Sequence, residues 1–176
     1  MDPLIVCVLD MDETLGTYDR QTFHVRPKIQ TLINLLRYIK SDIILWSLGR
    51  DEYVQRIVSG SLPDICKYAK KIFGHTQCHR AYERYNYYKA SEHIRIMYDC
   101  DIFLMGVDDK VSQNMDSQYD LRIQIQPYKQ PNSNDKAILE VCETIINSLM
   151  KAQDLRHEPL PVSKPSDDYV ENVWVY

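Results

Sequence analysis

Residues 4–15 read LIVCVLDMDETL, an apolar run that ends in two carboxylates spaced by one residue. The run Leu4–Leu9 is continuous rather than alternating, which is typical of a strand buried on both faces of a parallel sheet. The sequence therefore predicts a central strand that delivers Asp10 and Asp12 to the loop beyond its end.

Similar apolar runs and helical patterns follow one another along the chain. Further strands are expected at Ile43–Ser47, Lys71–Gly74, Ile102–Val107 and, as an edge strand, Arg122–Gln126. Helices are expected at Pro27–Lys40, Asp51–Ser59, Ala90–Met97 and about Asn134–Met150, with Pro27 in a first helical position and Ser133 or Asn134 as a cap. This alternation predicts an α/β fold with a doubly wound, mainly parallel sheet.

The composition limits how the chain is organised. It has 176 residues, of which 44% are apolar, so it can bury one sizeable core. We expect one domain over residues 1–152, followed by an extended tail over residues 153–176, where prolines and acidic residues gather. The formal net charge of −4 and the presence of only five glycines argue against a nucleic-acid-coating protein and against a glycine-rich phosphate loop.

The sequence also bears on cellular location. The longest apolar runs fall short of the roughly 18–20 residues that span a bilayer, so no membrane partner is expected. Asp2 and Pro3 stand where a secretory signal would be basic and then apolar. The five cysteines are scattered and odd in number, which favours free thiols in a reducing compartment. We therefore expect an intracellular protein, cytoplasmic or nuclear.

Polar residues follow three of the predicted strands, and they are Asp10, Ser47 and the pair Asp108-Asp109. Because the carboxyl ends of parallel strands meet at one edge of the sheet, where such folds bind ligands, we expect these residues to lie close together. Mg²⁺ prefers oxygen ligands and keeps positions for water and phosphate, and Asp10 with one acid of the pair suits it. In a simpler interpretation, Asp10 and Asp12 are turn residues, and Asp108-Asp109 caps a helix.

Four regions of the chain carry the pattern of a known family. They are LDMDETL at 9–15, DIILWSLGRDEYVQRIV at 42–58, CHRAYERYNYYK at 78–89, and GVDDK at 106–110 with LRIQIQPY at 121–128. In this order they resemble the haloacid-dehalogenase (HAD) superfamily of aspartate-nucleophile phosphatases, and within it the FCP/SCP branch of NLI-interacting-factor-like, CTD-phosphatase-like protein phosphatases. The chain departs from that branch after Lys89, where Ala90-Ser91 replaces the usual Asp-Leu. Its spacing from Asp108 to Asn114 is also similar to that of the small magnesium-dependent phosphatases of the superfamily.

The resemblance implies a role for each residue at the strand ends. Asp10 would be the nucleophile that forms an aspartyl-phosphate, and Asp12 would be the general acid and base. Ser47 and Lys89 would bind the phosphoryl oxygens, and Lys89 would also act in catalysis by offsetting the charge on the phosphoaspartate. Thr14 is counted among the phosphate-binding residues, and its hydroxyl is expected to tighten the loop by bonding the backbone.

The resemblance also implies Mg²⁺ as the cofactor. Asp10, the backbone carbonyl of Asp12, and Asp109 would bind the ion. Asp108 would either contact the metal or orient Lys89.

No interval between the motifs has room for a lid domain, because the expected helices and strands fill it. We therefore expect a HAD-like fold without a cap domain, whose open site admits a phosphate carried by a macromolecule. The predicted function is that of a Mg²⁺-dependent phosphatase, a phosphoric monoester hydrolase that acts on phosphoserine or phosphothreonine of a protein. The alternatives are a phosphotyrosine phosphatase, a phosphatase for nucleic-acid 3′-phosphates, which is less favoured, and a catalytically weak binding module.

Tyrosines gather directly before Lys89. Tyr82, Tyr85 and Tyr88 are expected either to form a wall that binds a peptide or to pack half-buried at the surface. Lys89 itself competes with the pair Lys70-Lys71 for the catalytic role, because a lone lysine is more often a solvated side chain.

Overall fold

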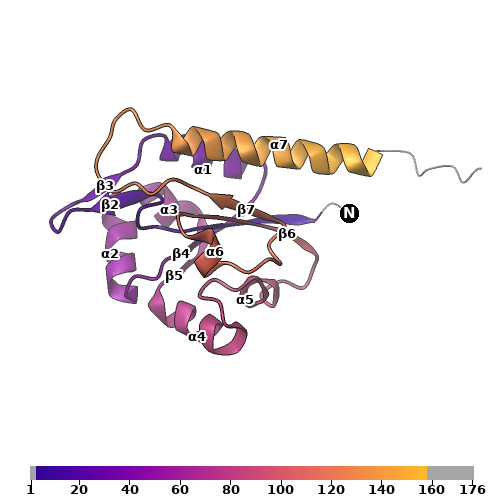
Figure 1. Ribbon diagram of the computed structural model, residues 1–176, viewed down its shortest axis with the longest axis horizontal. Coiled ribbons are helices and arrows are strands. Elements are labelled where there is room, and N and C mark those ends of the chain that lie inside the picture. The colour runs from indigo at the N-terminus through magenta and orange to yellow at the C-terminus, as the bar shows by residue number, and fades with distance from the viewer. Residues whose placement is uncertain (1–2, 158–176) are drawn as a thin grey trace, which may run out of the picture.

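The computed structural model of the chain describes residues 3–157. Its main sheet has five strands, all parallel, in the order β5-β4-β1-β6-β7 (Figure 1). They are β1 (Leu4–Leu9), β4 (Asp42–Trp46), β5 (Ala69–Phe73), β6 (Ile102–Asp108) and β7 (Leu121–Gln124). The strands after β1 are added first on one side of it and then on the other, so the order reverses at β1, where a crevice for ligands forms in such sheets.

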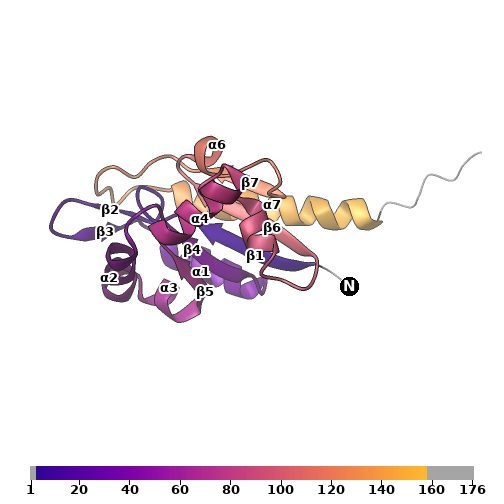
Figure 2. The same ribbon diagram turned by 90° about the horizontal axis from the view of Figure 1, so that it is seen from below.

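Helices cover both faces of this sheet. On one face lie α1 (Ile29–Tyr38), α2 (Asp51–Ser61), α3 (Pro63–Tyr68) and α7 (Ala137–His157). On the other lie α4 (His75–Tyr85), α5 (Ser91–Arg95) and α6 (Val111–Asn114). Figures 1 and 2 show α1 and α7 side by side on one side of the sheet and α4 and α5 on the opposite side. The predicted fold class, a doubly wound α/β fold with a parallel sheet, is confirmed.

Strand β1 shows why the apolar run in the sequence is continuous. Cys7 and Leu9 point into the core beneath α1, α2, α3 and α7, whereas Val6 and Val8 point into the core on the other face. All four are fully buried, because side chains alternate across a strand and both faces of this one are covered. The register places Leu9 beside Leu45 of β4 and Val107 of β6, so the three strands end together.

Between β1 and α1 the chain forms a small antiparallel hairpin, β2 (Gly16–Tyr18) and β3 (Phe23–Val25). The sequence did not predict this hairpin, because each strand has only three residues. A Cβ on Gly16 would lie 2.4 Å from the ring of Phe23, so the close approach of the two strands requires glycine there. Within residues 3–157, the intervals between the motifs hold this hairpin and the sheet's helices and strands rather than a lid domain.

Several helix boundaries differ from the predicted ones. Lys28 adopts a left-handed conformation with φ of 70°, so α1 begins after it, and Pro27 lies outside the helix rather than at its first position. Helix α7 begins at Ala137, whose amide bonds the carboxylate of Asp135 at 3.1 Å, so Asp135 takes the capping place expected of Ser133 or Asn134.

Three helices, α3, α4 and the short α6, were not among those predicted. Helix α4 buries only Cys78 and Ala81, so its sequence offers few apolar residues from which a helix could be recognised. At the other end of the chain, α7 continues to His157, and residues 153–157 of the expected tail are therefore helical. Residues 158–176, the rest of that tail, lie outside the described part of the chain. None of the helices described between residues 3 and 157 combines the length and apolar character needed to cross a membrane.

Helix α1 offers a direct test of the packing. Leu36 is fully buried against the sheet, whereas Tyr38, two residues later, is 85% exposed. We expect Leu36→Ala to lower the free energy of unfolding by about 2–5 kcal/mol, because it leaves a cavity in the core. Tyr38→Ala should change it by less than about 0.5 kcal/mol. Urea titration of both variants measures the difference, and equal effects would contradict the observed orientation of α1.

Candidate active site

The loop after β1 turns sharply and directs the carboxylates of Asp10 and Asp12 away from the apolar core that holds Met11. The amide of Asp10 continues the sheet by bonding the carbonyl of Val107 at 3.0 Å. Met11 is fully buried, and its carbonyl accepts the amide of Leu15 at 2.8 Å, which closes the turn. Because Met11 points into the core, Asp10 and Asp12 on either side of it face the edge of the sheet.

Asp10 is almost completely buried, and each of its carboxylate oxygens has a charged or hydroxyl donor. The ammonium of Lys89 lies 2.6 Å from Oδ1, and the hydroxyl of Thr14 donates to Oδ2 at 2.7 Å. Thr14 therefore bonds the side chain of the predicted nucleophile rather than the backbone expected from the sequence. Because both carboxylate oxygens are bonded, the carboxylate of Asp10 is held in one orientation.

Lys89 lies at the centre of the cluster. Its side chain is fully buried, and its ammonium contacts Asp108 Oδ2 at 2.5 Å as well as Asp10. Burial alone would lower the pKa of Lys89, but the two carboxylates outweigh burial and raise the pKa above its ordinary value. Of the competing pair, Lys71 is exposed, and Lys70 bonds Asp42 at the surface at 2.6 Å, so Lys89 is the lysine that lies beside Asp10.

Asp108 and Asp109 differ in their surroundings, which the sequence could not show. Asp108 is fully buried and accepts hydrogen bonds from Lys89, from the side-chain amide of Asn114 at 3.0 Å and from the backbone amide of Lys110 at 2.6 Å. Asp109 is only partly buried, and its backbone carbonyl accepts the side-chain amide of Gln124. Asp108 is thus occupied in holding Lys89, whereas the carboxylate of Asp109 is more accessible.

Three carboxylates lie close together here, and two of them contact Lys89. Ligand atoms of Asp10, Asp108 and Asp109 all lie within 4.8 Å of one another. Burial raises the pKa of Asp10 to about 7 against the opposing effect of Lys89, and burial with the charge of Asp108 raises the pKa of Asp109. The ionised cluster carries an excess of negative charge over Lys89. A hard divalent cation with oxygen ligands fits this donor set.

Asp12 lies apart from that acidic cluster and faces the end of β4. The hydroxyl of Ser47 donates to its Oδ2 at 3.3 Å, and the hydroxyl of Tyr53 donates to its Oδ1 at 2.5 Å. The amide of Gly49 in turn bonds Ser47 Oγ at 3.0 Å. The structure therefore brings Ser47 to Asp12 as the parallel sheet requires. Tyr53, in the first turn of α2, was not predicted, because an isolated tyrosine on a helix carries no signal of its own.

The loop between Asp10 and Gly16 is held from behind by Arg26, which sequence reasoning also missed. Its guanidinium donates to the carbonyl of Thr14 at 3.2 Å and binds the carboxylate of Asp135 through two bonds of 2.8 and 3.0 Å. The guanidinium also lies over the ring of Tyr128, 5.1 Å from its centroid. Because Asp135 also caps α7, this ion pair ties the last helix to the loop that carries Asp10.

The tyrosines before Lys89 do not form a single exposed wall. Tyr85, Tyr87 and Tyr88 are partly buried and pack against the core beneath α4, α5 and α6. Tyr82 is 42% exposed and stacks on Tyr88, with ring centroids 4.6 Å apart. Of the three tyrosines assigned to the wall, Tyr82 is therefore the exposed one, and Tyr85 and Tyr88 are partly buried.

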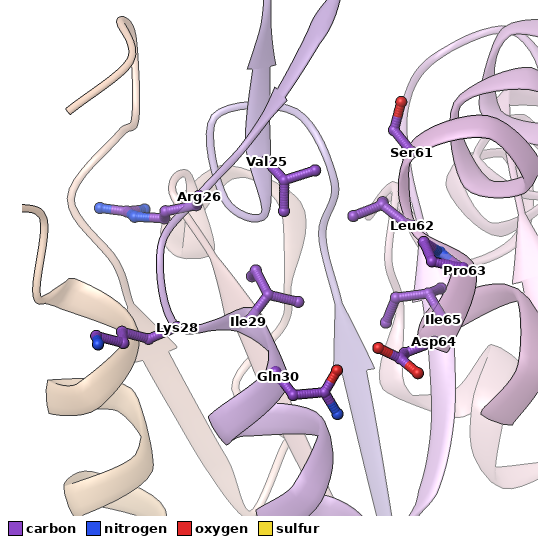
Figure 3. A pocket seen from close by; sticks show the side chains of 10 residues that line it. All are labelled: Val25, Arg26, Lys28, Ile29, Gln30, Ser61, Leu62, Pro63, Asp64 and Ile65. Carbon is purple, nitrogen blue, oxygen red and sulfur yellow. The ribbon is translucent and has the colours of Figure 1, made fainter. Parts of the chain in front are cut away.

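Two hollows lie away from these residues. A cavity of about 280 Å³ lies between the start of α1 and the junction of α2 and α3, lined among others by Val25, Ile29 and Leu62 (Figure 3). A larger hollow of about 1100 Å³ lies between α1, α7 and the first residues of β1 and β6. No residue of the Asp10 cluster lines either one. The candidate site at the carboxyl edge of the sheet is therefore separate from both hollows.

A buried aspartate beside a lysine at the end of the central strand, with a second carboxylate two residues later, is the arrangement that the resemblance to aspartate-nucleophile phosphatases predicts. The family model "NLI interacting factor-like phosphatase" matches residues 5–156. The chain therefore belongs to the family of NLI interacting factor-like phosphatases, as the four motifs predicted. No curated protein matches the chain by sequence.

Solved structures add the likeness of the fold. An arginine variant of the fission yeast RNA polymerase II CTD phosphatase Fcp1, bound to beryllium fluoride, aligns with a TM-score of 0.51 at 11% identity, over 88% of this chain and 53% of that one. A second structure of Fcp1, described as an essential RNA polymerase II CTD phosphatase, aligns with a TM-score of 0.48 at 12% identity, over 90% and 55%.

A structure of another phosphatase also aligns, the 3-deoxy-D-manno-octulosonate 8-phosphate phosphatase from Moraxella catarrhalis in complex with magnesium and phosphate ions. It does so with a TM-score of 0.42 at 11% identity, over 87% of this chain and 91% of that one. The chain thus spans about half the length of the two Fcp1 chains.

The Arg26 ion pair can be tested against a surface pair of similar distance. Arg26→Met leaves the buried carbonyl of Thr14 without the guanidinium donor and the carboxylate of Asp135 without its cationic partner, so we expect the free energy of unfolding to fall by about 2–5 kcal/mol. Lys70→Met breaks the exposed bond to Asp42 and should cost less than about 1 kcal/mol. Denaturant titration measures both. Similar costs for the two variants would show that Arg26 does not hold the loop.

Proposed function

We propose that this chain is a Mg²⁺-dependent phosphatase that forms an aspartyl-phosphate on Asp10 and acts on phosphoserine or phosphothreonine of a protein. The observation that carries the proposal is the buried carboxylate of Asp10, fixed between Lys89 and Thr14 at the end of β1. A nucleophile that is already oriented needs no rearrangement before it attacks.

In the first step, one oxygen of Asp10 attacks phosphorus, and the bond between phosphorus and the leaving oxygen breaks. Asp12 gives its proton to that leaving oxygen, so the alcohol departs neutral. In the second step, Asp12 takes a proton from water, and the resulting hydroxide attacks phosphorus, which releases phosphate and restores Asp10. The position of Asp12 outside the Asp10 cluster suits this role, because a carboxyl group that carries a proton must be accessible to the leaving oxygen and to water.

Lys89 and Ser47 serve the transferred group. Lys89 lies 2.6 Å from Asp10, so its positive charge offsets the charge of the phosphoaspartate, while Asp108 and Asn114 hold Lys89 in place. Ser47 Oγ, which donates to Asp12 without a substrate, would turn to a phosphoryl oxygen when one is bound. In this scheme the contribution of Thr14 to phosphate binding is indirect, since its hydroxyl orients Asp10.

Asp10, Asp109 and the backbone carbonyl of Asp12 would hold Mg²⁺, and Asp108, occupied by Lys89, would not need to contact it. When bound, the ion would neutralise the charge of the phosphoryl oxygens. The intracellular location expected from the sequence, cytoplasmic or nuclear, agrees with a ligand set that suits an abundant cytosolic cation.

The nucleophile is tested by Asp10→Asn. The change keeps the size of the side chain but removes the attacking oxyanion, so hydrolysis of an aryl phosphate should fall by about 10³-fold or more. Activity is measured as phosphate released in the presence of Mg²⁺. A variant that keeps more than about a tenth of the wild-type rate would exclude Asp10 as the nucleophile.

The metal ligand is tested by Asp109→Ala. Loss of one carboxylate should weaken Mg²⁺ binding, so the rate should fall at low Mg²⁺ and recover in part as its concentration rises. Asn132→Ala, which changes an exposed residue of the loop before α7, serves as the control and should keep the wild-type dependence on Mg²⁺. A rate that never depends on divalent cation, in the wild type or the variant, would contradict the proposed cofactor.

The choice of a protein substrate is tested at Tyr82, the exposed tyrosine above Tyr88. Tyr82→Ala should lower kcat/KM for a phosphoserine peptide by about 5–20-fold, because a peptide loses an aromatic contact, while an aryl phosphate should be nearly unaffected. Equal losses on both substrates would assign Tyr82 to folding. A wild-type preference for a 3′-phosphorylated oligonucleotide over every phosphopeptide would favour the nucleic-acid alternative.

A further inference from the structure

The carboxylate of Asp12 accepts hydrogen bonds from two hydroxyl groups, one on the residue directly after β4 and the other in the first turn of α2. Tyr53 donates to Oδ1 at 2.5 Å, and Ser47 donates to Oδ2 at 3.3 Å. The two bonds use different oxygens, so together they fix the rotational orientation of the carboxyl group. The short bond belongs to Tyr53, a residue that the reaction scheme above does not use.

Tyr53 is itself well fixed. Its ring meets the edge of Tyr18 from the β2–β3 hairpin, with centroids 5.8 Å apart, and the guanidinium of Arg56 lies 5.8 Å from its centroid. On the other side, a Cβ on Gly49 would lie 2.7 Å from the Tyr53 ring, so the backbone passes closer than any other residue type would allow. A tyrosine packed in this way holds its hydroxyl at one point.

The hydroxyl of Tyr53 also keeps its proton. Burial, together with the adjacent negative charge of Asp12, raises the pKa of Tyr53 well above its ordinary value. The hydroxyl of Tyr53 is the donor of the bond to Asp12, and the carboxylate of Asp12 is the acceptor. Tyr53 contacts Asp12 rather than the Asp10 cluster, so it belongs to the proton carrier and not to the nucleophile.

We propose that Tyr53 is the positioning residue of the general acid, and this inference rests on the proposed function. By occupying Oδ1, the Tyr53 hydroxyl leaves Oδ2 of Asp12, the oxygen beside Ser47, to exchange the proton with the leaving group and later with water. Since Ser47 binds a phosphoryl oxygen in that scheme, Oδ2 is the oxygen nearer the reacting phosphate. Without Tyr53 the carboxyl group would rotate, and protonation of the leaving oxygen would lose its preset geometry.

The test is Tyr53→Phe, which removes the hydroxyl and keeps the ring against Tyr18. For phosphate esters of good leaving groups, such as nitrophenol, kcat/KM should change by less than about 3-fold, because these groups depart without a proton. For phenyl and alkyl phosphates it should fall by about 10–100-fold. The slope of log kcat/KM against the pKa of the leaving group should therefore steepen. A uniform loss across the series, or no loss, would overturn the inference.

Two controls separate positioning from packing. Tyr18→Phe removes a hydroxyl from the neighbouring ring and should leave the leaving-group slope unchanged. In an Asp12→Asn background, where no proton carrier remains, Tyr53→Phe should have no further effect on poor leaving groups, and an additional loss of similar size would contradict the proposal. Thermal unfolding of Tyr53→Phe should match the wild type to within a few degrees, and a large fall would assign the hydroxyl to folding.

The outcomes also distinguish this inference from the function on which it rests. If the wild type hydrolyses the esters and Asp10→Asn does not, the proposed function stands whatever Tyr53→Phe shows. If the wild type hydrolyses none of them, the proposed function and the positioning role fall together.

Discussion

The structure depends on one buried ammonium group placed between two buried carboxylates. Lys89 has no exposure to solvent, and it contacts both Asp10 and Asp108. Burying an ammonium group without partners has a desolvation free energy that no single hydrogen bond offsets. The fold must therefore bring the three groups together. Asp10 follows β1, Asp108 ends β6, and Lys89 arrives through α4 and the loop after it. Any arrangement of the sheet that separated β1 from β6 would deprive Lys89 of at least one of its two carboxylate partners.

The parts of the fold that could be predicted are those with a local pattern. Continuous apolar runs such as Leu4–Leu9 identified the buried strands, and polar residues directly after them identified the edge of the sheet that carries Asp10 and Ser47. The parts that could not be predicted depend on contacts between distant segments. The β2–β3 hairpin has three residues in each strand, which is too short to show a pattern, and α4 buries only Cys78 and Ala81, so it has too few apolar residues to be recognised.

The same distinction applies within the site. Residue types at strand ends indicated Asp10, Asp12 and Asp108-Asp109, and the structure brings three of these acids to within 4.8 Å. The residues that hold them were not visible in the sequence. In the sequence, Arg26 cannot be told from an ordinary surface arginine. In the structure, its contact with Asp135, 109 positions later, shows that it supports the loop. Supporting residues of this kind are recognised by their partners, and partners far apart in the chain emerge only from the folded structure.

Two aspartates separated by one residue thus occupy quite different surroundings. Asp10 is buried, ion-paired and unable to turn, which suits a nucleophile that must meet phosphorus along one line. Asp12 is partly exposed and bonded only by neutral hydroxyl groups, which suits a carboxyl group that must gain and lose a proton in one cycle. The difference arises from Met11 between them, because its anchorage in the core turns one carboxylate towards Lys89 and the other towards β4 and α2. A turn of three residues in this way gives two identical side chains different surroundings, as the proposed division of roles between them requires.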